Sequence, residues 1–524
     1  MRKAALVLFS FLVYACAKNE LSNVKTVEAP VSLPVMEVRD VQASANGYGL
    51  ALKKDLDDGT FNTEEYGRFE ENSFLRATDN PLSTFSIDVD RASYANVRRF
   101  ITSGQRPPRD AVRIEEMINY FTYDYPEPTS APFSVTTELA QCPWNGEHRL
   151  LLVGLQGKRI HTEDLPPTNL VFLIDTSGSM MSADKLTLVK QSLRLLVDQL
   201  RPADRVAIVA YAGSAGLVLP STSGSDKASI LAAIEELEAG GSTAGGEGIV
   251  LAYNVARENF VERGNNRVIL ATDGDFNVGV TSDGELEQLI EKERGDGIFL
   301  TVLGFGTGNL KDSKMELLAD KGNGNYAYID TVDEARKTLV HEMGATLLTI
   351  AKDVKIQIEF NPAQVGAYRL IGYENRLLRK EDFNNDKKDA GEMGAGHSVT
   401  ALYEIIPPGA EVPNAPVDPL KYQNTAANDG GSELATVKLR YKDPDGDTSK
   451  LLTQIVANTT SPAMSDNIRL AASVAQLGML LRDSPNKGNA SMDSVLELAR
   501  SVRTKDVGGY RRDFVALVQK AESL

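Results

Sequence analysis

The chain has 524 residues, of which 42% are hydrophobic and 24% charged, and its formal net charge is −16. A single hydrophobic core rarely grows to this length, so two or three folded units are expected. The acidic balance argues against binding to nucleic acid or to anionic lipid, because both need a basic protein face. The composition is otherwise ordinary for a globular protein and identifies no partner.

The N-terminus has the pattern of a bacterial export signal. Basic Arg2-Lys3 precedes a largely apolar run over residues 4–15, which is too short to span a bilayer as a permanent helix. The run ends in Val13-Tyr14-Ala15-Cys16, which resembles a lipobox, although Tyr14 stands where that pattern prefers a small residue. The resemblance implies that residues 1–15 are removed and that Cys16 is lipidated. An ordinary signal peptide with a coincidental cysteine is the alternative.

The remaining sequence is consistent with a protein anchored outside the cytoplasm. Cys142 is the only other cysteine, so an acylated Cys16 leaves no intramolecular disulfide. Residues 16–74 show no sustained periodicity and contain Pro30 and Pro34, which is typical of a tether. Ordered structure is expected to start near Asn80. These features predict a lipid-anchored location in the cell envelope, on the extracytoplasmic side of a bacterial membrane.

Between residues 166 and 350, apolar strands alternate with amphipathic helices. Strands are predicted at 170–174, 205–211, 267–271, 298–303 and 326–329, and helices at 186–200, 227–237, 248–260, 286–294 and 313–319. Leu170–Ile174 is a continuous apolar run, as expected for a strand buried on both faces. The alternation predicts an α/β domain with a doubly wound, mainly parallel sheet, whose ligand sites lie at the C-terminal ends of the strands.

The flanking regions predict a β-sandwich-like domain and C-terminal helices. Segment 75–165 contains a strand-like run at 81–90, helical patterns at 91–103 and 110–121, and strands at 133–139 and 148–155. Segment 351–524 contains five alternating strands, two long loops (380–396 and 407–431), and three helices from about Asp466. We expect the strands of Phe133–Leu155 to pair with those after Val354, which would make the α/β domain an insertion in one sandwich.

Oxygen-bearing side chains gather at the predicted strand ends. The first strand of the α/β domain ends in Asp175-Thr176-Ser177-Gly178-Ser179, a glycine-rich loop contains Thr243, and the strand at 267–271 is followed by Asp273. Carboxylate and hydroxyl oxygens are the ligands that Mg²⁺ prefers, and no His or Cys lies nearby to suggest zinc. The pattern predicts a divalent-cation site, with Mg²⁺ favoured and Mn²⁺ or Ca²⁺ as alternatives.

This arrangement resembles the metal-ion-dependent adhesion site of the von Willebrand factor type A (VWA) family, and all five positions match. The resemblance implies that Ser177, Ser179 and Thr243 contact the metal directly or nearly so, and that Asp175 and Asp273 often act through water. It also implies a coordination position that an Asp or Glu of a protein partner fills. Five other stretches resemble a bacterial family of exported VWA lipoproteins with a VWA-associated N-terminal segment and a C-terminal domain of unknown function: 86–90, 113–120, 142–145, 322–326 and 371–376.

Other motifs are weaker. Gly304-Phe305-Gly306-Thr307-Gly308 is similar to a dinucleotide-binding loop, but Asn309 stands where the last glycine is required. Asp443–Asp447 is interpreted as a hairpin turn, and the acidic residues between 382 and 389 as a solvated loop. His341-Glu342 lacks the second histidine of a zinc protease motif, because Ala345 stands there.

The sequence as a whole favours a membrane-tethered, metal-dependent protein-binding module that is not an enzyme. Two alternatives stay open. In the first, the metal only stabilises an envelope assembly protein. In the second, the protein is a metal-dependent hydrolase, for which Glu247 and Asp275 are the nearest candidate bases.

Overall fold

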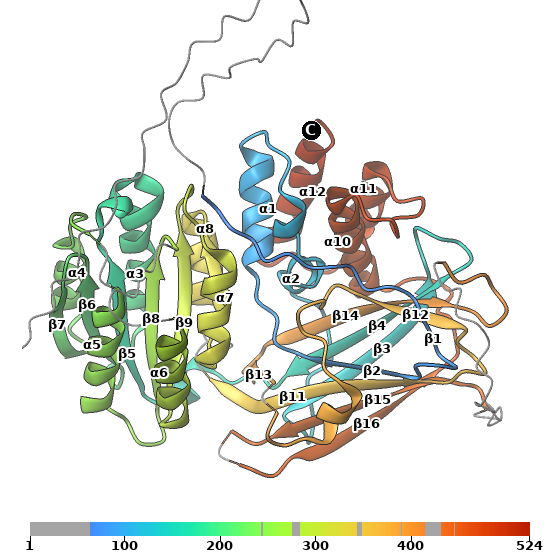
Figure 1. Cartoon of the computed structure of the whole chain (residues 1–524), viewed down its shortest axis with the longest axis horizontal. Coiled ribbons are helices and arrows are strands. Elements are labelled where there is room, and N and C mark those ends of the chain that lie inside the picture. The colour runs from blue at the N-terminus through green and yellow to red at the C-terminus, as the bar shows by residue number, and fades with distance from the viewer. Residues whose placement is uncertain are drawn as a thin grey trace, which may run out of the picture. The chain divides into compact units, whose positions relative to one another are not determined.

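The computed structural model describes residues 63–242, 245–274, 283–342, 348–388, 390–413, 431–444 and 446–524. These residues form three sheets with associated helices (Figure 1). One sheet belongs to the predicted α/β domain, and the other two are antiparallel. Cys16 and Thr243 lie outside the described residues.

The α/β domain contains a six-stranded sheet in the order β10-β9-β8-β5-β6-β7. The strands are β5 (Thr168–Asp175), β6 (Arg205–Tyr211), β7 (Ala215–Ser223), β8 (Asn265–Thr272), β9 (Ile298–Phe305) and β10 (Tyr326–Ile329). Five strands run parallel, which confirms the predicted fold class, whereas β7 runs antiparallel to β6. The sequence did not predict β7, because this edge strand leaves Leu217 and Val218 exposed and so lacks a regular apolar alternation.

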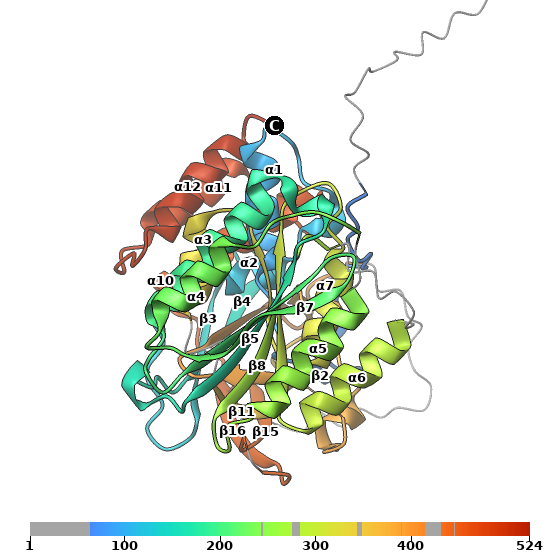
Figure 2. The same cartoon turned by 90° about the vertical axis from the view of Figure 1, so that its left-hand side faces the viewer.

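Helices cover both faces of this sheet (Figure 2). On one face lie α5 (Gly245–Glu258), α6 (Asp283–Gly295) and α7 (Asp312–Lys321), which share a core with Val171 and Leu173 of β5. On the other face lie α3 (Leu188–Gln199), α4 (Lys227–Glu235) and α8 (Val332–Arg336), which share a core with Leu170, Phe172 and Ile174. The continuous apolar run of β5 is explained by this double coverage.

The two antiparallel sheets pack face to face around a shared core. The first has the order β1-β12-β14-β4-β3, with strands β1 (Leu75–Arg76), β12 (Ala367–Ile371), β14 (Ser398–Ile406), β4 (Arg149–Gly157) and β3 (Phe133–Gln141). The second has the order β13-β11-β15-β16, with strands β13 (Gly391–Gly394), β11 (Thr349–Phe360), β15 (Glu433–Lys442) and β16 (Lys450–Ala457), and β2 (Leu82–Ser86) also pairs with β11. The predicted sandwich is therefore present.

Both sheets combine strands from before and after the α/β domain. Strand β4 pairs with β14, with Leu152 opposite Leu402, and β2 pairs with β11, with Phe85 opposite Ile356. The predicted pairing of Phe133–Leu155 with later strands is thus confirmed. The chain enters the α/β domain after β4 and returns to the sandwich at β11, so the domain is inserted between two strands of the sandwich.

Five helices bury the outer side of the β4–β14 pair. They are α1 (Ala92–Thr102), α2 (Ile114–Asn119), α10 (Asp466–Arg482), α11 (Met492–Ser501) and α12 (Tyr510–Ala521). Leu150 and Leu152 of β4 face these helices, whereas Leu151 and Val153 face the sandwich core. Among the described residues, no helix is long and apolar enough to cross a membrane.

Two sequence predictions about loops were wrong. Residues 63–79, expected to belong to the tether or to precede ordered structure, pack against distant parts of the chain. Glu64 accepts hydrogen bonds from Arg99, and Ser484 donates to Glu71 at 2.6 Å. This segment has almost no regular secondary structure, so periodicity could not reveal it.

The second wrong prediction concerns residues 380–396, which were predicted as a loop. They contain a 3₁₀ helix at Lys380–Asn384 and strand β13.

Candidate metal centre

The site is built on the end of β5. All residues of this strand are buried, and its last residue, Asp175, has no exposed surface. Strands β6 and β8 lie on either side of β5 and run parallel to it. The C-terminal ends of three strands therefore meet here, as expected for a ligand site in a doubly wound sheet.

A tight turn follows Asp175 and is tied to the glycine-rich loop. The Thr176 amide donates to the Tyr211 carbonyl, and the Gly178 amide donates to the Gly241 carbonyl at 3.0 Å. The Gly240 amide returns a hydrogen bond to the Thr176 carbonyl at 2.8 Å. Gly241 has φ of 88°, a conformation that favours glycine. The structure thus brings the loop that leads to Thr243 against the Asp175–Ser179 turn.

The Asp175 carboxylate is held by three donors. Its Oδ1 accepts from the Ser177 amide at 2.9 Å, and its Oδ2 accepts from the Tyr211 hydroxyl and the Thr272 hydroxyl, each at 3.2 Å. Burial, together with the charge of Asp273, raises the pKa of Asp175, although hydrogen bonds from Ser177 and Tyr211 oppose the shift. The carboxylate is therefore fixed in orientation and stripped of bulk water.

The two serines of the turn lie together. Ser177 Oγ and Ser179 Oγ are 2.9 Å apart, and Ser177 is buried whereas Ser179 is exposed. Their hydroxyls supply neutral oxygen donors next to the Asp175 carboxylate. One side of the donor set therefore faces solvent.

Asp273 completes the described donors and has a lysine partner that the sequence did not predict. Asp273 follows β8 and is fully buried, and Lys185 Nζ donates to its Oδ2 and to Asn309 Oδ1, each at 2.9 Å. Burial alone would raise the pKa of Asp273, but hydrogen bonds from Asn309 and Ser179 and the charge of Lys185 lower it. Lys185 lies just before α3, where its positive charge is unfavourable with the helix dipole. This unfavourable position was the sequence signal that could have indicated a special role for the lysine.

The chemistry of the donor set fits a hard divalent cation. Two carboxylates and two hydroxyls lie at the neighbouring ends of β5 and β8, and Mg²⁺ or Ca²⁺ takes such oxygen ligands. Within the described ranges there is no cluster of three or more His, Cys, Asp or Glu side chains suited to a metal. The candidate site instead depends on serine hydroxyls, which belong to a different class of ligand.

A groove of about 940 Å³ adjoins this site. It is lined by Ser179, Asp184 and Lys185, by residues 306–309 after β9, and by residues of α1 together with Thr63 and Glu64. The α1 wall is fixed by ion pairs, because Arg98 binds Asp330 and Glu334 while Arg99 binds Glu64. The exposed side of the metal donors therefore opens into a walled groove.

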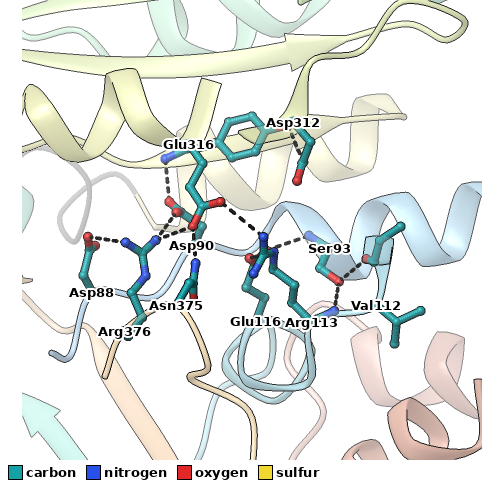
Figure 3. A network of polar contacts seen from close by, with 12 residues as sticks. Asp88, Asp90, Ser93, Val112, Arg113, Glu116, Asp312, Glu316, Asn375 and Arg376 are labelled. Atoms are coloured by element: carbon teal, nitrogen blue, oxygen red, sulfur yellow. Dashed lines mark hydrogen bonds and ion pairs between the residues drawn. The ribbon is translucent and has the colours of Figure 1, made fainter. Parts of the chain in front are cut away.

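The segment after β9 connects the site to the sandwich. Asn309 contacts Lys185, and α7 begins at Asp312. On α7, Glu316 contacts Arg376, which follows β12 (Figure 3). Asp320 of the same helix also contacts Arg376. Arg376 also binds Asp88 and Asp90 of the segment after β2. The α/β domain is thus joined to the sandwich by a buried network rich in carboxylates.

The structure describes some of the residues proposed for other chemistry. Glu247 is exposed in the first turn of α5, and Asp275 lies outside the described residues. Asp386, from the acidic loop, accepts hydrogen bonds from Arg440 and Ser449, and Asp443 pairs with Lys450. Asp386 and Asp443 therefore have basic partners within the protein.

Comparisons with known proteins agree with this architecture. Residues 169–342 match the family described as "von Willebrand factor type A domain", and residues 60–152 match the one described as "von Willebrand factor". Residues 345–524 match "Uncharacterized protein YfbK, C-terminal".

Individual proteins are also similar to this chain to different extents. YfbK of Escherichia coli (strain K12) is 46% identical over 473 residues, which cover 88% of this chain and 82% of that protein. Human inter-alpha-trypsin inhibitor heavy chain H4 is 30% identical over 150 residues, 27% of this chain and 16% of that protein. A solved structure of von Willebrand factor type A from Catenulispora acidiphila is 14% identical, with a TM-score of 0.39, over 87% of this chain and 91% of that one. The chain belongs to the YfbK family of proteins with a von Willebrand factor type A domain.

Proposed function

We propose that the VWA domain binds a divalent cation through Asp175, Ser177, Ser179, Asp273 and Thr243, and that the bound cation captures an acidic side chain of a protein partner. A VWA domain suggests a protein-interaction module, and the metal dependence is our extension of that role. The observation that carries the proposal is the convergence of carboxylates and serine hydroxyls from the ends of β5 and β8 at the mouth of a groove.

The donor set explains why a partner would be needed. The hydroxyls of Ser177, Ser179 and Thr243 are neutral ligands, so they bind a divalent cation without reducing its positive charge. An incoming Asp or Glu would supply a charge-assisted contact that water does not. Ser179 is exposed and lines the groove, so a partner side chain has access to this side of the donors.

We also propose that the protein is held at a bacterial membrane, on its extracytoplasmic side, by a lipid on Cys16. The support is the basic start, the short apolar run and the Val13–Cys16 motif. Labelling cells with a radioactive or clickable fatty acid tests this directly. Label in the wild type that is lost in Cys16→Ala supports the anchor, and absence of label from the wild type contradicts it.

The metal site is tested by isothermal titration of Mg²⁺, Mn²⁺ and Ca²⁺ into the purified protein. We expect saturable one-site binding that Asp175→Ala abolishes. Asp184→Ala is the matched control, because Asp184 lies in the same groove but is not one of the proposed ligands. Wild-type protein that binds none of the three ions would contradict the proposal.

A second experiment separates partner capture from a purely structural metal. If the metal only stabilises the fold, Ser177→Ala should lower the thermal unfolding temperature and leave partner binding intact. If the cation captures a carboxylate, Ser177→Ala should reduce Mg²⁺-dependent partner binding even under conditions where the variant remains fully folded.

A further inference from the structure

Lys185 is a buried lysine whose ammonium group lies within the proposed metal site. The residue is 7% exposed, and Nζ donates to Asp273 Oδ2 and Asn309 Oδ1, each at 2.9 Å. Burying a lysine is unfavourable unless its charge is paired, and here the paired carboxylate is itself a proposed metal donor. The site thus contains a lysine ammonium group in contact with one of its carboxylates.

Several features of the chain hold Lys185 in this position. Its backbone leaves helical geometry, with φ −116° and ψ −110°, inside the turn Ala183–Thr187. Its side chain lies across Gly306, where an added Cβ would lie 2.8 Å from Lys185 Cδ and still closer to Cγ and Cε. Gly306 also has φ of 74°, which favours glycine. The lysine is therefore seated by the fold and is not a surface side chain that happens to reach the site.

The charges of the site indicate what this lysine does. Asp175 and Asp273 together carry two negative charges and could neutralise a divalent cation completely. With Lys185 added, the loaded site keeps one net positive charge. Lys185 also lines the groove next to Ser179, so this charge lies where a partner would approach.

We propose that Lys185 is a positioning residue that weakens binding of the free cation and strengthens capture of a carboxylate by the loaded site. This inference depends on the proposed function of the site. In this arrangement the metal alone binds with modest affinity, and the complex of metal and partner carboxylate is favoured. Lys185 thereby makes occupancy of the site depend on the partner.

The test compares wild type with Lys185→Met, which keeps the aliphatic stem and removes the charge, and with Lys185→Arg, which keeps the charge. Lys190→Met, on α3, is the matched control because Lys190 contacts the Glu235 carbonyl and not the site. Mg²⁺ affinity is measured by isothermal titration. Acetate, as the carboxylate probe, is titrated into Mn²⁺-loaded protein while water-proton relaxation reports the displacement of metal-bound water. Thermal unfolding confirms that each variant is folded.

We expect Lys185→Met to bind Mg²⁺ about tenfold more tightly and acetate several-fold more weakly than the wild type, because one charge near the metal is removed. The Mg²⁺ and acetate affinities of Lys185→Arg should be closer to those of the wild type. Lys190→Met should have the same affinities as the wild type. Unchanged or weaker Mg²⁺ binding by folded Lys185→Met, or unchanged acetate binding, would overturn the inference while leaving the proposed function in place. Absence of metal binding in the wild type would overturn the proposed function and, with it, this inference, whatever Lys185→Met does.

Discussion

Replacing Arg376 with methionine tests how the VWA domain is held on the sandwich. Arg376 is 10% exposed and contacts four carboxylates: Glu316 at 2.8 Å, Asp90 at 2.9 Å, Asp88 at 3.3 Å and Asp320 at 2.5 Å. Glu316 and Asp320 belong to α7 of the VWA domain, and Asp88 and Asp90 belong to the segment between β2 and α1. Figure 3 shows Arg376 with Asp88, Asp90 and Glu316. Methionine would fill a similar volume but would leave the four carboxylates without this guanidinium.

The expected loss in the free energy of unfolding is about 3–5 kcal/mol at pH 8, the range found when one partner of a buried ion pair is removed. The loss should shrink as the pH falls. Burial raises the pKa of Asp90 and of Asp320, and Arg376 opposes this by favouring their ionised forms. At pH 5 the variant can protonate these carboxylates at little cost, so the missing guanidinium matters less.

Urea denaturation of the purified wild type and Arg376→Met, followed by circular dichroism between pH 5 and pH 8, measures this effect. Arg194→Met is the control, because Arg194 and Glu235 form an ion pair in which the side chains are 50% and 46% exposed. Such a pair is expected to contribute less than about 1 kcal/mol. A loss below about 1 kcal/mol for Arg376→Met at pH 8, or a larger loss that does not vary with pH, would refute the reasoning.

Two further predictions concern the same part of the molecule. Burial raises the pKa of Asp312 from 3.8 to about 7, with Glu316 and Glu64 adding to the shift and Arg113 and Tyr326 opposing it, so the folded protein holds this proton more tightly than the unfolded chain does. The contribution of Asp312 to the free energy of unfolding should therefore fall by about 4 kcal/mol as the pH rises from 3.8 to about 7. Asp312→Asn should flatten this decline in urea titrations. An unchanged pH profile would contradict the raised pKa of Asp312. Gly306→Ala should lower stability by about 1–3 kcal/mol in thermal unfolding, because the new Cβ meets the Lys185 stem at a positive φ, whereas Gly284→Ala, with nothing within 4 Å, should not destabilise. Equal effects of the two glycine substitutions would count against the crowding of Lys185.

The sequence predicted the sheet of the VWA domain because each central strand is an apolar run with a clear end. It did not predict β7 or the packed segment 63–79, for related reasons. Strand β7 lies at an edge and keeps part of its apolar surface exposed, so its sequence lacks the alternation of a half-buried strand. The segment 63–79 is held by individual polar contacts with residues far away in the chain, such as that of Asn72 with the Leu370 carbonyl at 3.1 Å. Periodicity reports repeated burial, and neither segment has it.

For the site, sequence spacing predicted the candidate donors but not the residues that surround them. The structure brings Asp175, Ser177, Ser179 and Asp273 to neighbouring strand ends, while Thr243 lies outside the described residues. Lys185 and Asn309 were missed because their role arises from tertiary contacts. Asn309 was noted only as the residue that spoils a dinucleotide-binding motif, yet its side chain holds the lysine that pairs with Asp273.

Because the VWA domain is inserted in the sandwich, the way it is docked there bears on the site at the end of β5. An inserted domain has two covalent connections to its host, and here its position is further set by α7, whose buried face carries Glu316 and Asp320 into the Arg376 network. The segment that holds Lys185 through Asn309 leads directly into that helix at Asp312. A shift of this segment would have to move the start of α7, and α7 is fixed to the sandwich by ion pairs. Breaking such an ion pair costs several kcal/mol when it leaves a buried charge without a partner. The geometry of the proposed metal site and the docking of the domain are therefore mechanically linked through residues 306–321. If the site binds a cation as proposed, Arg376→Met should alter the cation affinity measured by isothermal titration, although the contacts of Arg376 lie on α7 and the sandwich.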